Sequence, residues 1–432
     1  MRAARAFLLG SALALAMMHC GSRSQILGDV DTSSTGDDSG NAPPKTDAAA
    51  DAIADAIDEG HIRLGDAIVE DDVKITAGEG HACVRTHAGD VYCWGENSLG
   101  QLGDGTLVTR AKPAKVAGIP PAITIAAGTH HTCILGGDQS VWCWGGNSQA
   151  ELGQGKRGDP QTTPIQVQGL TAPPGTLSNA PIGIAAGGFH TCTFDNAGTV
   201  HCWGANTQGE SGASDAAFVL SPHVVQGLGV VTAVAAGFQH TCAVEEAGNV
   251  KCWGYNNDGQ LGNNDSGGRE ILPVDAIGVT DAVSLACGDD HSCAVLKDGT
   301  MKCWGDGGSG ELGQGRPQLS EIAVTVIGMS DARQAGAGKE HTCVVTNAHT
   351  VSCFGSGLAG QLGIGSTPFF QATPVTVQVT DARSVATGDD FTCVAHSNHG
   401  VTCWGGNSYG QLGTGTISDG GVTPLPVDVI GL

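Results

Sequence analysis

The residues in this sequence that could most readily bind a metal or react are a histidine and two cysteines that recur together. In the stretch "HSCAVLKDGTMKCWG", His291 stands two positions before Cys293, and Cys303 follows ten positions later. Imidazole and thiolate both bind zinc, but structural zinc sites take four ligands and separate paired cysteines by only two to four residues. Facing cysteines on two adjacent strands form a disulfide instead. We therefore favour a disulfide over a metal site and expect no cofactor.

A β-hairpin explains the ten-residue step. A three-residue loop at 297–299 places Gly299 where a left-handed conformation is needed. Counting outwards from this loop, Cys293 faces Cys303 in a non-hydrogen-bonded pair, where antiparallel side chains are closest. Gln139, His349 and His399 replace this glycine in three other copies. Their turns are expected to carry a modest strain of about 1 kcal/mol.

The same cysteine pair occurs seven times along the chain. The predicted disulfides are Cys83–Cys93, Cys133–Cys143, Cys192–Cys202, Cys242–Cys252, Cys293–Cys303, Cys343–Cys353 and Cys393–Cys403. Two cysteines remain, Cys20 near the N-terminus and Cys287, which we interpret as a small buried thiol. Seven disulfides indicate an oxidising compartment outside the cytosol.

The elements that position these residues form a repeat with a period of about 50 residues. Each copy contains four short strand segments, ending in a "PV" strand such as "LPVDAIG" at 272–278. The predicted fold is all-β, a seven-bladed β-propeller of four-stranded blades with one disulfide per blade, because closure of the ring protects the sheet edges. We expect the C-terminal segment 422–432 to supply a strand missing from the first blade. Residues 62–70 are the alternative.

The repeat resembles that of the regulator of chromosome condensation family, across about residues 73–432. The resemblance rests on copies such as "CWGENSLGQLGDG" from Cys93 and "CWGGNSYGQLGTG" from Cys403. It implies a seven-bladed propeller, and the paired cysteines resemble an exported bacterial branch of the family. Phe391 replaces the repeat histidine and Phe354 replaces the tryptophan, which we interpret as tolerated changes within a packed repeat. The founding member is a nucleotide exchange factor that binds chromatin, an activity we judge unlikely for an exported, acidic chain.

The evidence for other functional sites is weaker. Six histidines recur once per repeat, a regularity that favours hydrogen bonds between blades over catalysis: His81, His131, His190, His240, His291 and His341. Paired carboxylates occur at 289–290 and 389–390, but calcium binding needs six to eight oxygen ligands, so they are weak candidates. An insertion in the second repeat offers a candidate binding loop with Thr171, Pro173, Pro174, Ser178 and Asn179. No catalytic site is predicted, so we expect the protein not to be an enzyme.

The N-terminus predicts export. Residues 1–20 combine a basic start with a short apolar run, as in a signal peptide, and Cys20 stands where a lipoprotein signal places its lipidated cysteine. Residues 21–60 are rich in Ser, Asp, Gly and Ala and are expected to form a disordered acidic tether, followed by the propeller at 61–432. The predicted location is the bacterial cell envelope, as an outer-membrane lipoprotein or at the cell surface.

Charge narrows the choice of partner. The formal net charge of −23 disfavours nucleic acid and anionic membrane surfaces, leaving a lipid anchor as the only expected membrane contact. The sequence thus predicts a monomeric, exported propeller that binds a protein or glycan through a loop face. The alternatives are an enzyme with a loop-built site at the central channel and a purely structural surface module.

Overall fold

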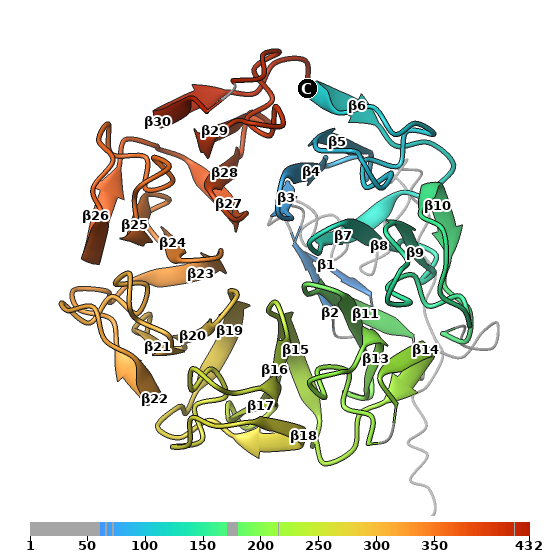
Figure 1. The fold of residues 1–432 in the computed structure, drawn as a ribbon, viewed down its shortest axis with the longest axis horizontal. Coiled ribbons are helices and arrows are strands. Elements are labelled where there is room, and N and C mark those ends of the chain that lie inside the picture. The colour runs from blue at the N-terminus through green and yellow to red at the C-terminus, as the bar shows by residue number, and fades with distance from the viewer. Residues whose placement is uncertain (1–60, 65–66, 71–72, 171–179, 215, 419) are drawn as a thin grey trace, which may run out of the picture. The chain divides into compact units, whose positions relative to one another are not determined.

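The computed structural model describes residues 61–64, 67–70, 73–170, 180–214, 216–418 and 420–432. Its described part from residue 73 onwards is a ring of seven four-stranded antiparallel sheets, numbered here as blades 1 to 7 along the chain (Figure 1). The predicted seven-bladed propeller is therefore confirmed. None of the described residues forms a helix that is long and apolar enough to cross a membrane.

Each blade consists of four strands consecutive in sequence, with the first strand at the centre of the ring and the fourth at the rim (Figure 1). Blade 1 contains β3 (Lys74–Ala77), β4 (His81–Arg85), β5 (Val91–Gly95) and β6 (Arg110–Lys115). Blade 2 contains β7 (Ala122–Ala127), β8 (His131–Gly136), β9 (Val141–Gly145) and β10 (Gln161–Gln166). Blade 3 contains β11 (Pro181–Ala186), β12 (His190–Asp195), β13 (Val200–Ala205) and β14 (Phe218–Val224).

The remaining four blades repeat this order without exchange of strands. Blade 4 contains β15 (Val231–Ala236), β16 (His240–Glu245), β17 (Val250–Tyr255) and β18 (Arg269–Asp275). Blade 5 contains β19 (Ala282–Cys287), β20 (His291–Leu296), β21 (Met301–Gly305) and β22 (Ser320–Thr325). Blade 6 contains β23 (Ala332–Ala337), β24 (His341–Thr346), β25 (Val351–Ser356) and β26 (Phe370–Val377). Blade 7 contains β27 (Ala382–Thr387), β28 (Phe391–His396), β29 (Val401–Gly406) and β30 (Val422–Asp428).

The hairpin register predicted from the cysteine spacing is confirmed. Cys293 faces Cys303 across β20 and β21, and their Cα atoms lie 4.1 Å apart, as a non-hydrogen-bonded pair requires. All seven predicted pairs are bonded within their own hairpin. The turns without glycine adopt the same left-handed conformation, with φ of 67° at Gln139, 58° at His349 and 68° at His399.

The predicted closure of the ring is wrong. The C-terminal strand β30 pairs with β29 and is the outer strand of blade 7, so it does not complete blade 1. The alternative also fails, since β1 (His61–Leu64) and β2 (Ala67–Glu70) pair only with each other. Blade 1 already has four strands of its own. Each "PV" segment is the outer strand of its own blade. The loop before it reverses the chain, so the segment pairs with the strand that precedes that loop.

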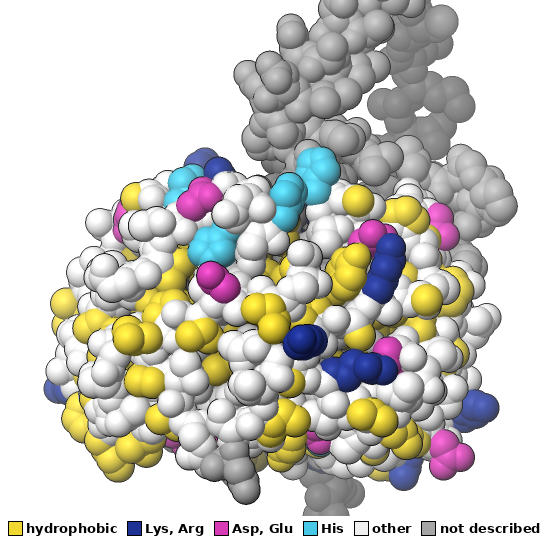
Figure 2. Space-filling view, turned by 90° about the horizontal axis from the view of Figure 1, so that it is seen from above, with side chains coloured by type: hydrophobic (Ala, Val, Ile, Leu, Met, Phe, Trp, Pro, Cys, Tyr) yellow, Lys and Arg dark blue, Asp and Glu magenta, His cyan; other side chains and the backbone are white. Residues whose placement is uncertain are grey.

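Packing between blades replaces strand exchange as the means of closure. The hydrophobic clusters lie at the seams between neighbouring blades. At the seam between the last blade and the first, Trp94 and Val84 of blade 1 pack with Phe391 and Leu412 of blade 7. The side view in Figure 2 shows hydrophobic, acidic and basic side chains interspersed around the ring, with histidines gathered near one edge.

Candidate binding face around the central channel

A recurring histidine joins each blade to the next. In six of the seven seams its Nε2 lies 2.7–2.9 Å from a hydroxyl oxygen of the following blade. The pairs are His81–Thr132, His131–Thr191, His190–Thr241, His240–Ser292, His291–Thr342 and His341–Thr392. Each hydroxyl donates its own hydrogen to a backbone carbonyl, so the imidazole Nε2–H is the donor to the hydroxyl oxygen.

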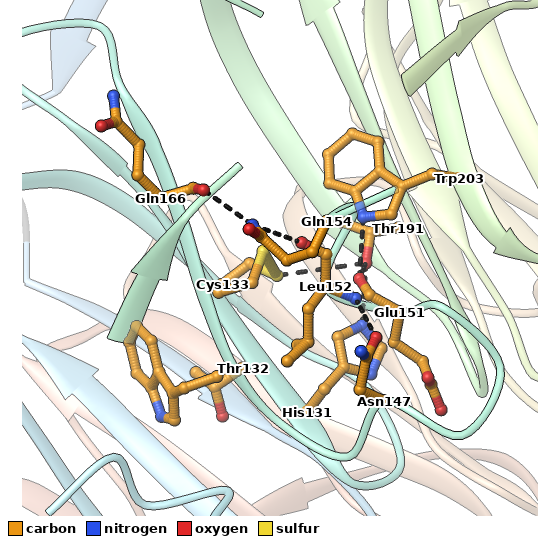
Figure 3. Close-up of a disulfide and its surroundings, with 12 residues drawn as sticks. His131, Thr132, Cys133, Asn147, Glu151, Leu152, Gln154, Gln166, Thr191 and Trp203 are labelled. Carbon is orange, nitrogen blue, oxygen red and sulfur yellow. Dashed lines mark hydrogen bonds between the residues drawn. A yellow bond between two sulfur atoms is a disulfide. The ribbon is translucent and has the colours of Figure 1, made fainter. Parts of the chain in front are cut away.

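The tryptophan of the "CWG" motif shares the same carbonyl. Figure 3 shows the seam between blades 2 and 3, where the Nε1–H of Trp203 donates to the backbone oxygen of Glu151 at 2.7 Å. Thr191 donates to that oxygen at 3.1 Å and lies beside the sulfur of Cys133. The motifs "HxC", "CWG" and "GQLG" thus meet across the seam, which explains why they recur together.

These histidines are structural. Burial lowers the pKa of His81, His131, His190, His240 and His341 to about 3. Burial also lowers the pKa of His291, to about 4. A neutral, buried imidazole that is used in the same way at every seam fits the hydrogen-bonding role predicted for it. The zinc hypothesis for His291, Cys293 and Cys303 is excluded in this state, because both sulfurs are consumed in a disulfide.

The seam between blades 7 and 1 differs from the others because it has neither the histidine nor the hydroxyl residue of the hydrogen bond between blades. Phe391 replaces the histidine, and Ala82 replaces the threonine that would receive its hydrogen bond. Both side chains are fully buried in one hydrophobic cluster. The two changes compensate each other in volume. Here a larger phenyl ring faces a small methyl group, whereas at the other seams a smaller imidazole faces a larger side chain with a hydroxyl.

The central channel is lined by the ends of the innermost strands, mostly alanine and glycine. The glycines are required there. A Cβ on Gly237 would lie 2.3 Å from the His240 ring and 2.4 Å from the carbonyl oxygen of Gly288 in the next blade. The walls therefore carry few functional groups, Cys287 and Thr387 among them, and most of the variation lies in the two residues that follow each glycine. We call these positions, at one end of the channel, the channel mouth: 79–80, 129–130, 188–189, 238–239, 289–290, 339–340 and 389–390.

One part of the channel mouth is acidic. Blades 5, 6, 7 and 1 contribute an acidic arc of Asp289, Asp290, Glu340, Asp389, Asp390 and Glu79, interrupted by Lys339. The pKa of Asp389 is raised to about 7, mainly by burial and in smaller part by the nearby carboxylates of Asp289 and Glu79. Burial likewise raises the pKa of Asp289 to about 6, opposed by Lys339. The arc therefore holds desolvated carboxyl groups that a cation would stabilise in their charged form.

The aromatic part of the channel mouth comes from blades 3 and 4. Phe189 and Phe238 are half-buried, with ring centroids 5.5 Å apart in an edge-to-face arrangement. Gly188 precedes Phe189 and leaves room beside the pair: a Cβ there would lie 2.7 Å from the Phe238 ring. A symmetric scaffold thus presents an asymmetric surface, apolar on one side and acidic on the other.

Comparison with known proteins settles the family. Two sequence patterns of the Regulator of chromosome condensation (RCC1) repeat match the chain, one at 88–135, 138–194, 197–244 and 247–295. The other matches 73–101, 122–151, 182–210, 231–260, 282–311 and 382–411, and together they cover more than half of the chain. The protein belongs to the RCC1 repeat family.

Relatives within the RCC1 family are distant. The mitochondrial RCC1 domain-containing protein RUG3 of Arabidopsis thaliana is 30% identical over 247 residues, which cover 55% of this chain and 43% of RUG3. Protein pim1 of Schizosaccharomyces pombe is 28% identical over 170 residues, or 35% of this chain and 31% of pim1. Each match thus spans less than half the length of the curated relative, so the activities of the whole relatives do not transfer.

Solved RCC1-type structures show the same fold. Yeast RCC1 (Prp20), in the structure with bound Kap60, superposes with a TM-score of 0.70 at 22% identity, covering 79% of this chain and 84% of that one. Human WBSCR16 gives a TM-score of 0.69 at 21% identity, covering 79% and 94%. At these identities the likeness shows the fold alone.

Only some of the predicted site residues of this RCC1 protein lie in the described part of the structure. The candidate loop residues Thr171, Pro173, Pro174, Ser178 and Asn179 lie outside the described residues, as does Cys20. Among the described residues, neither aspartate pair has a third His, Cys, Asp or Glu side chain close enough for a metal site.

Sequence reasoning missed the aromatic pair Phe189 and Phe238. The signal that would have found it is variation at the two positions after each repeat glycine, where an otherwise regular repeat is free to differ.

Proposed function

We propose that this RCC1-repeat protein is an exported, lipid-anchored binding propeller that holds a partner protein at its channel mouth. The observation that carries the proposal is the division of that mouth into an acidic arc and an aromatic pair. Binding sites on repeat scaffolds concentrate in variable turns held by a rigid frame. Here the frame is the hydrogen-bonded seams, and the variation lies in the turns.

The chemistry of the channel mouth selects the partner. A segment with lysine or arginine beside an apolar or aromatic side chain would pair its cation with the acidic arc and its apolar group with Phe189 and Phe238. Interfaces of this kind derive their affinity from buried aromatic anchors, and they derive association rate and specificity from charge complementarity. A glycan could use the aromatic rings but would leave the carboxylates without a cation, so a protein fits better.

Solved structures of related propellers support protein binding as a use of the fold. Yeast RCC1 (Prp20) has been solved bound to Kap60, and the Saccharomyces cerevisiae Prp20p structure is described together with its binding to Gsp1p and histones. Those partners belong to those proteins. For this protein we propose only that its own channel mouth is a protein interface.

The test compares two double variants of the full chain, each of which replaces two acidic side chains by their amides, as bait in cell-envelope extract. Asp289→Asn with Asp389→Asn removes charge from the acidic arc, while Glu246→Gln with Asp331→Asn removes equal charge from exposed loops at the opposite edge. We expect the first variant to lose specific partners, with affinity for a purified partner reduced at least about 10-fold, or about 1.4 kcal/mol. The second should bind like the unmodified protein. Equal binding by all three, or equal loss in both variants, would refute the channel mouth as the site.

Binding should also depend on pH. A cationic partner favours ionised carboxylates, and the pKa values of Asp289 and Asp389 are raised to about 6 and about 7. Affinity should therefore rise between pH 5 and pH 8 and fall with added salt. A glycan ligand would show neither dependence, which distinguishes the two classes of partner.

Export and anchoring rest on the sequence of residues 1–20 and on the disulfides. Labelled fatty acid should be incorporated into the full chain and lost in Cys20→Ser. Incorporation that persists in the variant would remove the anchor from the proposal without affecting the channel mouth.

A further inference from the structure

A group of soft donor atoms lies at the seam between blades 4 and 5. His240, Cys242 and Cys287 each place a ligand atom within 4.8 Å of the other two. Among the described residues, this is the one group of three or more His, Cys, Asp or Glu side chains with such spacing. Cys242 is bonded to Cys252, which leaves its sulfur a weak neutral donor. Cys287 is the free cysteine of the described chain.

The thiol is an addition to an otherwise standard seam. Cys287 ends the innermost strand of blade 5, directly before the channel glycine. The other blades have alanine or threonine at this position: Ala77, Ala127, Ala186, Ala236, Ala337 and Thr387. The sulfurs of Cys287 and Cys242 lie 3.8 Å and 3.7 Å from the Ser292 hydroxyl, so the thiol faces the disulfide of the preceding blade.

The second donor is the imidazole of His240. The Ser292 hydroxyl donates to the Gln260 carbonyl, so the His240 Nε2–H donates to Ser292 at 2.8 Å. Its Nδ1 is then a lone-pair acceptor, and this atom is buried without a hydrogen-bond partner. Burial keeps the ring neutral, which leaves a nitrogen lone pair available for coordination.

The site lies beside the central channel. Cys287 lines the central channel, whose mouth carries Glu79, Asp289 and Asp389. A cluster of carboxylates raises the local concentration of cations. A cation that enters from this end therefore reaches the residue that carries the thiol.

We propose that Cys287 and His240 bind a soft monovalent cation of the Cu(I) class in the seam between blades 4 and 5. On binding, the Cys287 S–H proton leaves to solvent, a metal–sulfur bond forms, and a His240 nitrogen donates its lone pair. The oxidation state of the metal does not change. Thiolate and imidazole donors suit soft cations that accept few ligands. A cation midway between atoms at most 4.8 Å apart lies at most about 2.4 Å from each, near metal–nitrogen and metal–sulfur bond lengths of about 2.0–2.3 Å.

The protonation state of the thiol gives the site a signature. Burial raises the pKa of Cys287 to about 12, so the free thiol stays protonated near neutral pH. The cation must displace that proton, and binding should strengthen as pH rises. This site is separate from the proposed protein interface and stands if that interface fails.

Silver(I) is the probe, because it is soft and does not change oxidation state. The full-length oxidised protein carrying Cys20→Ser, which leaves Cys287 as its one cysteine outside the disulfides, is titrated in chloride-free nitrate buffer and followed by native mass spectrometry and a pH-stat. We expect one tightly bound equivalent, one proton released, and an X-ray absorption spectrum with sulfur and nitrogen in the first shell.

The repeat supplies matched controls. Cys287→Ala restores the residue found in five other blades and should abolish the tight equivalent without loss of thermal stability. Adding Ala186→Cys to that variant places a thiol beside His131 and the disulfide of blade 2, and should restore binding. Tight binding that persists in Cys287→Ala, or a first shell without nitrogen, would overturn the proposal. So would a rise in free thiols, since silver would then have opened a disulfide.

Discussion

Glu311 is a buried carboxyl at a position where four other blades have glutamine. The glutamines are Gln101, Gln260, Gln361 and Gln411. Its side chain accepts a hydrogen bond from the Ser309 backbone N–H at 2.8 Å, a bond that Gln101 makes equally well to Leu99 at 2.9 Å. The pKa of Glu311 is raised from 4.5 to about 8, mainly by burial and in smaller part by the nearby carboxylates of Asp306 and Glu340.

The raised pKa predicts how Glu311→Gln changes stability with pH. The folded protein keeps the Glu311 proton up to about pH 8, whereas the unfolded chain loses it above about pH 4.5. Stability therefore falls across that window in the unmodified protein and not in the variant. At pH 9 the variant should unfold with a free energy higher by at least about 1.4 kcal/mol, the equivalent of one pKa unit. Denaturation at pH 4 and pH 9 checks this, and a difference that is the same at both values would contradict it.

At the scale of the element, the unit is a hairpin closed by a disulfide. The bond joins residues that the register already holds 4.1 Å apart at Cα, so it restricts the unfolded chain more than it shapes the folded blade. The histidine of each hairpin contacts the following blade, as His131 contacts Thr191, and its tryptophan contacts the preceding blade, as Trp144 contacts Gln101. One blade is therefore held by its neighbours as well as by its own bridge.

The paired replacement Cys293→Ala with Cys303→Ala should destabilise the protein moderately. A short loop of this kind contributes up to about 2–3 kcal/mol in the chain-entropy model, and we expect less because hairpin neighbours are preorganised. Differential scanning calorimetry should show a lower melting temperature with the ring still folded. Mass mapping without reductant should find the other six bridges unchanged; bridges between different hairpins would show that the native pairing differs from the one described.

For the whole molecule, the decisive contact is the seam that joins blade 7 to blade 1. It lacks the histidine–hydroxyl hydrogen bond of the other six seams and has Phe391 against Ala82 instead. Trp94 keeps its bond there, donating to the Gln411 carbonyl at 2.8 Å. The ring is thus closed by side-chain packing and by a loop contact, in which the Gly415 N–H donates to the Ala111 carbonyl at 2.7 Å, rather than by a shared strand.

A double-mutant cycle tests this closure. Phe391→His alone buries an imidazole without its hydroxyl partner, and Ala82→Thr alone crowds the phenyl ring, so each should cost about 1–3 kcal/mol. Together they rebuild the pair found at the other seams. The double variant should be more stable than the sum of the single effects predicts, by at least about 1 kcal/mol. Additive effects in chemical denaturation would show that the two residues do not act as a pair.

Much of the fold was determined by sequence because its signals are local. The spacing of Cys293 and Cys303 around Gly299 specifies a hairpin register, and seven copies of that hairpin specify a ring. The structural role of the repeat histidines also followed from their regularity alone. The register needs only a turn and the geometry of facing strands within one copy, and the ring needs only the number of copies along the chain.

Tertiary structure decided the rest, because it depends on which residues meet across a seam or around the channel. Phe189 and Phe238 are 49 positions apart, and Asp289 and Asp389 are 100 apart, yet each pair shares one end of the channel. The meeting of Cys287 with His240, and the packing of Phe391 on Ala82, likewise join different repeats. The "PV" strand was assigned to the wrong blade for the same reason. Its sequence marks it as a strand, but only the pairing of β30 with β29 shows which sheet it completes.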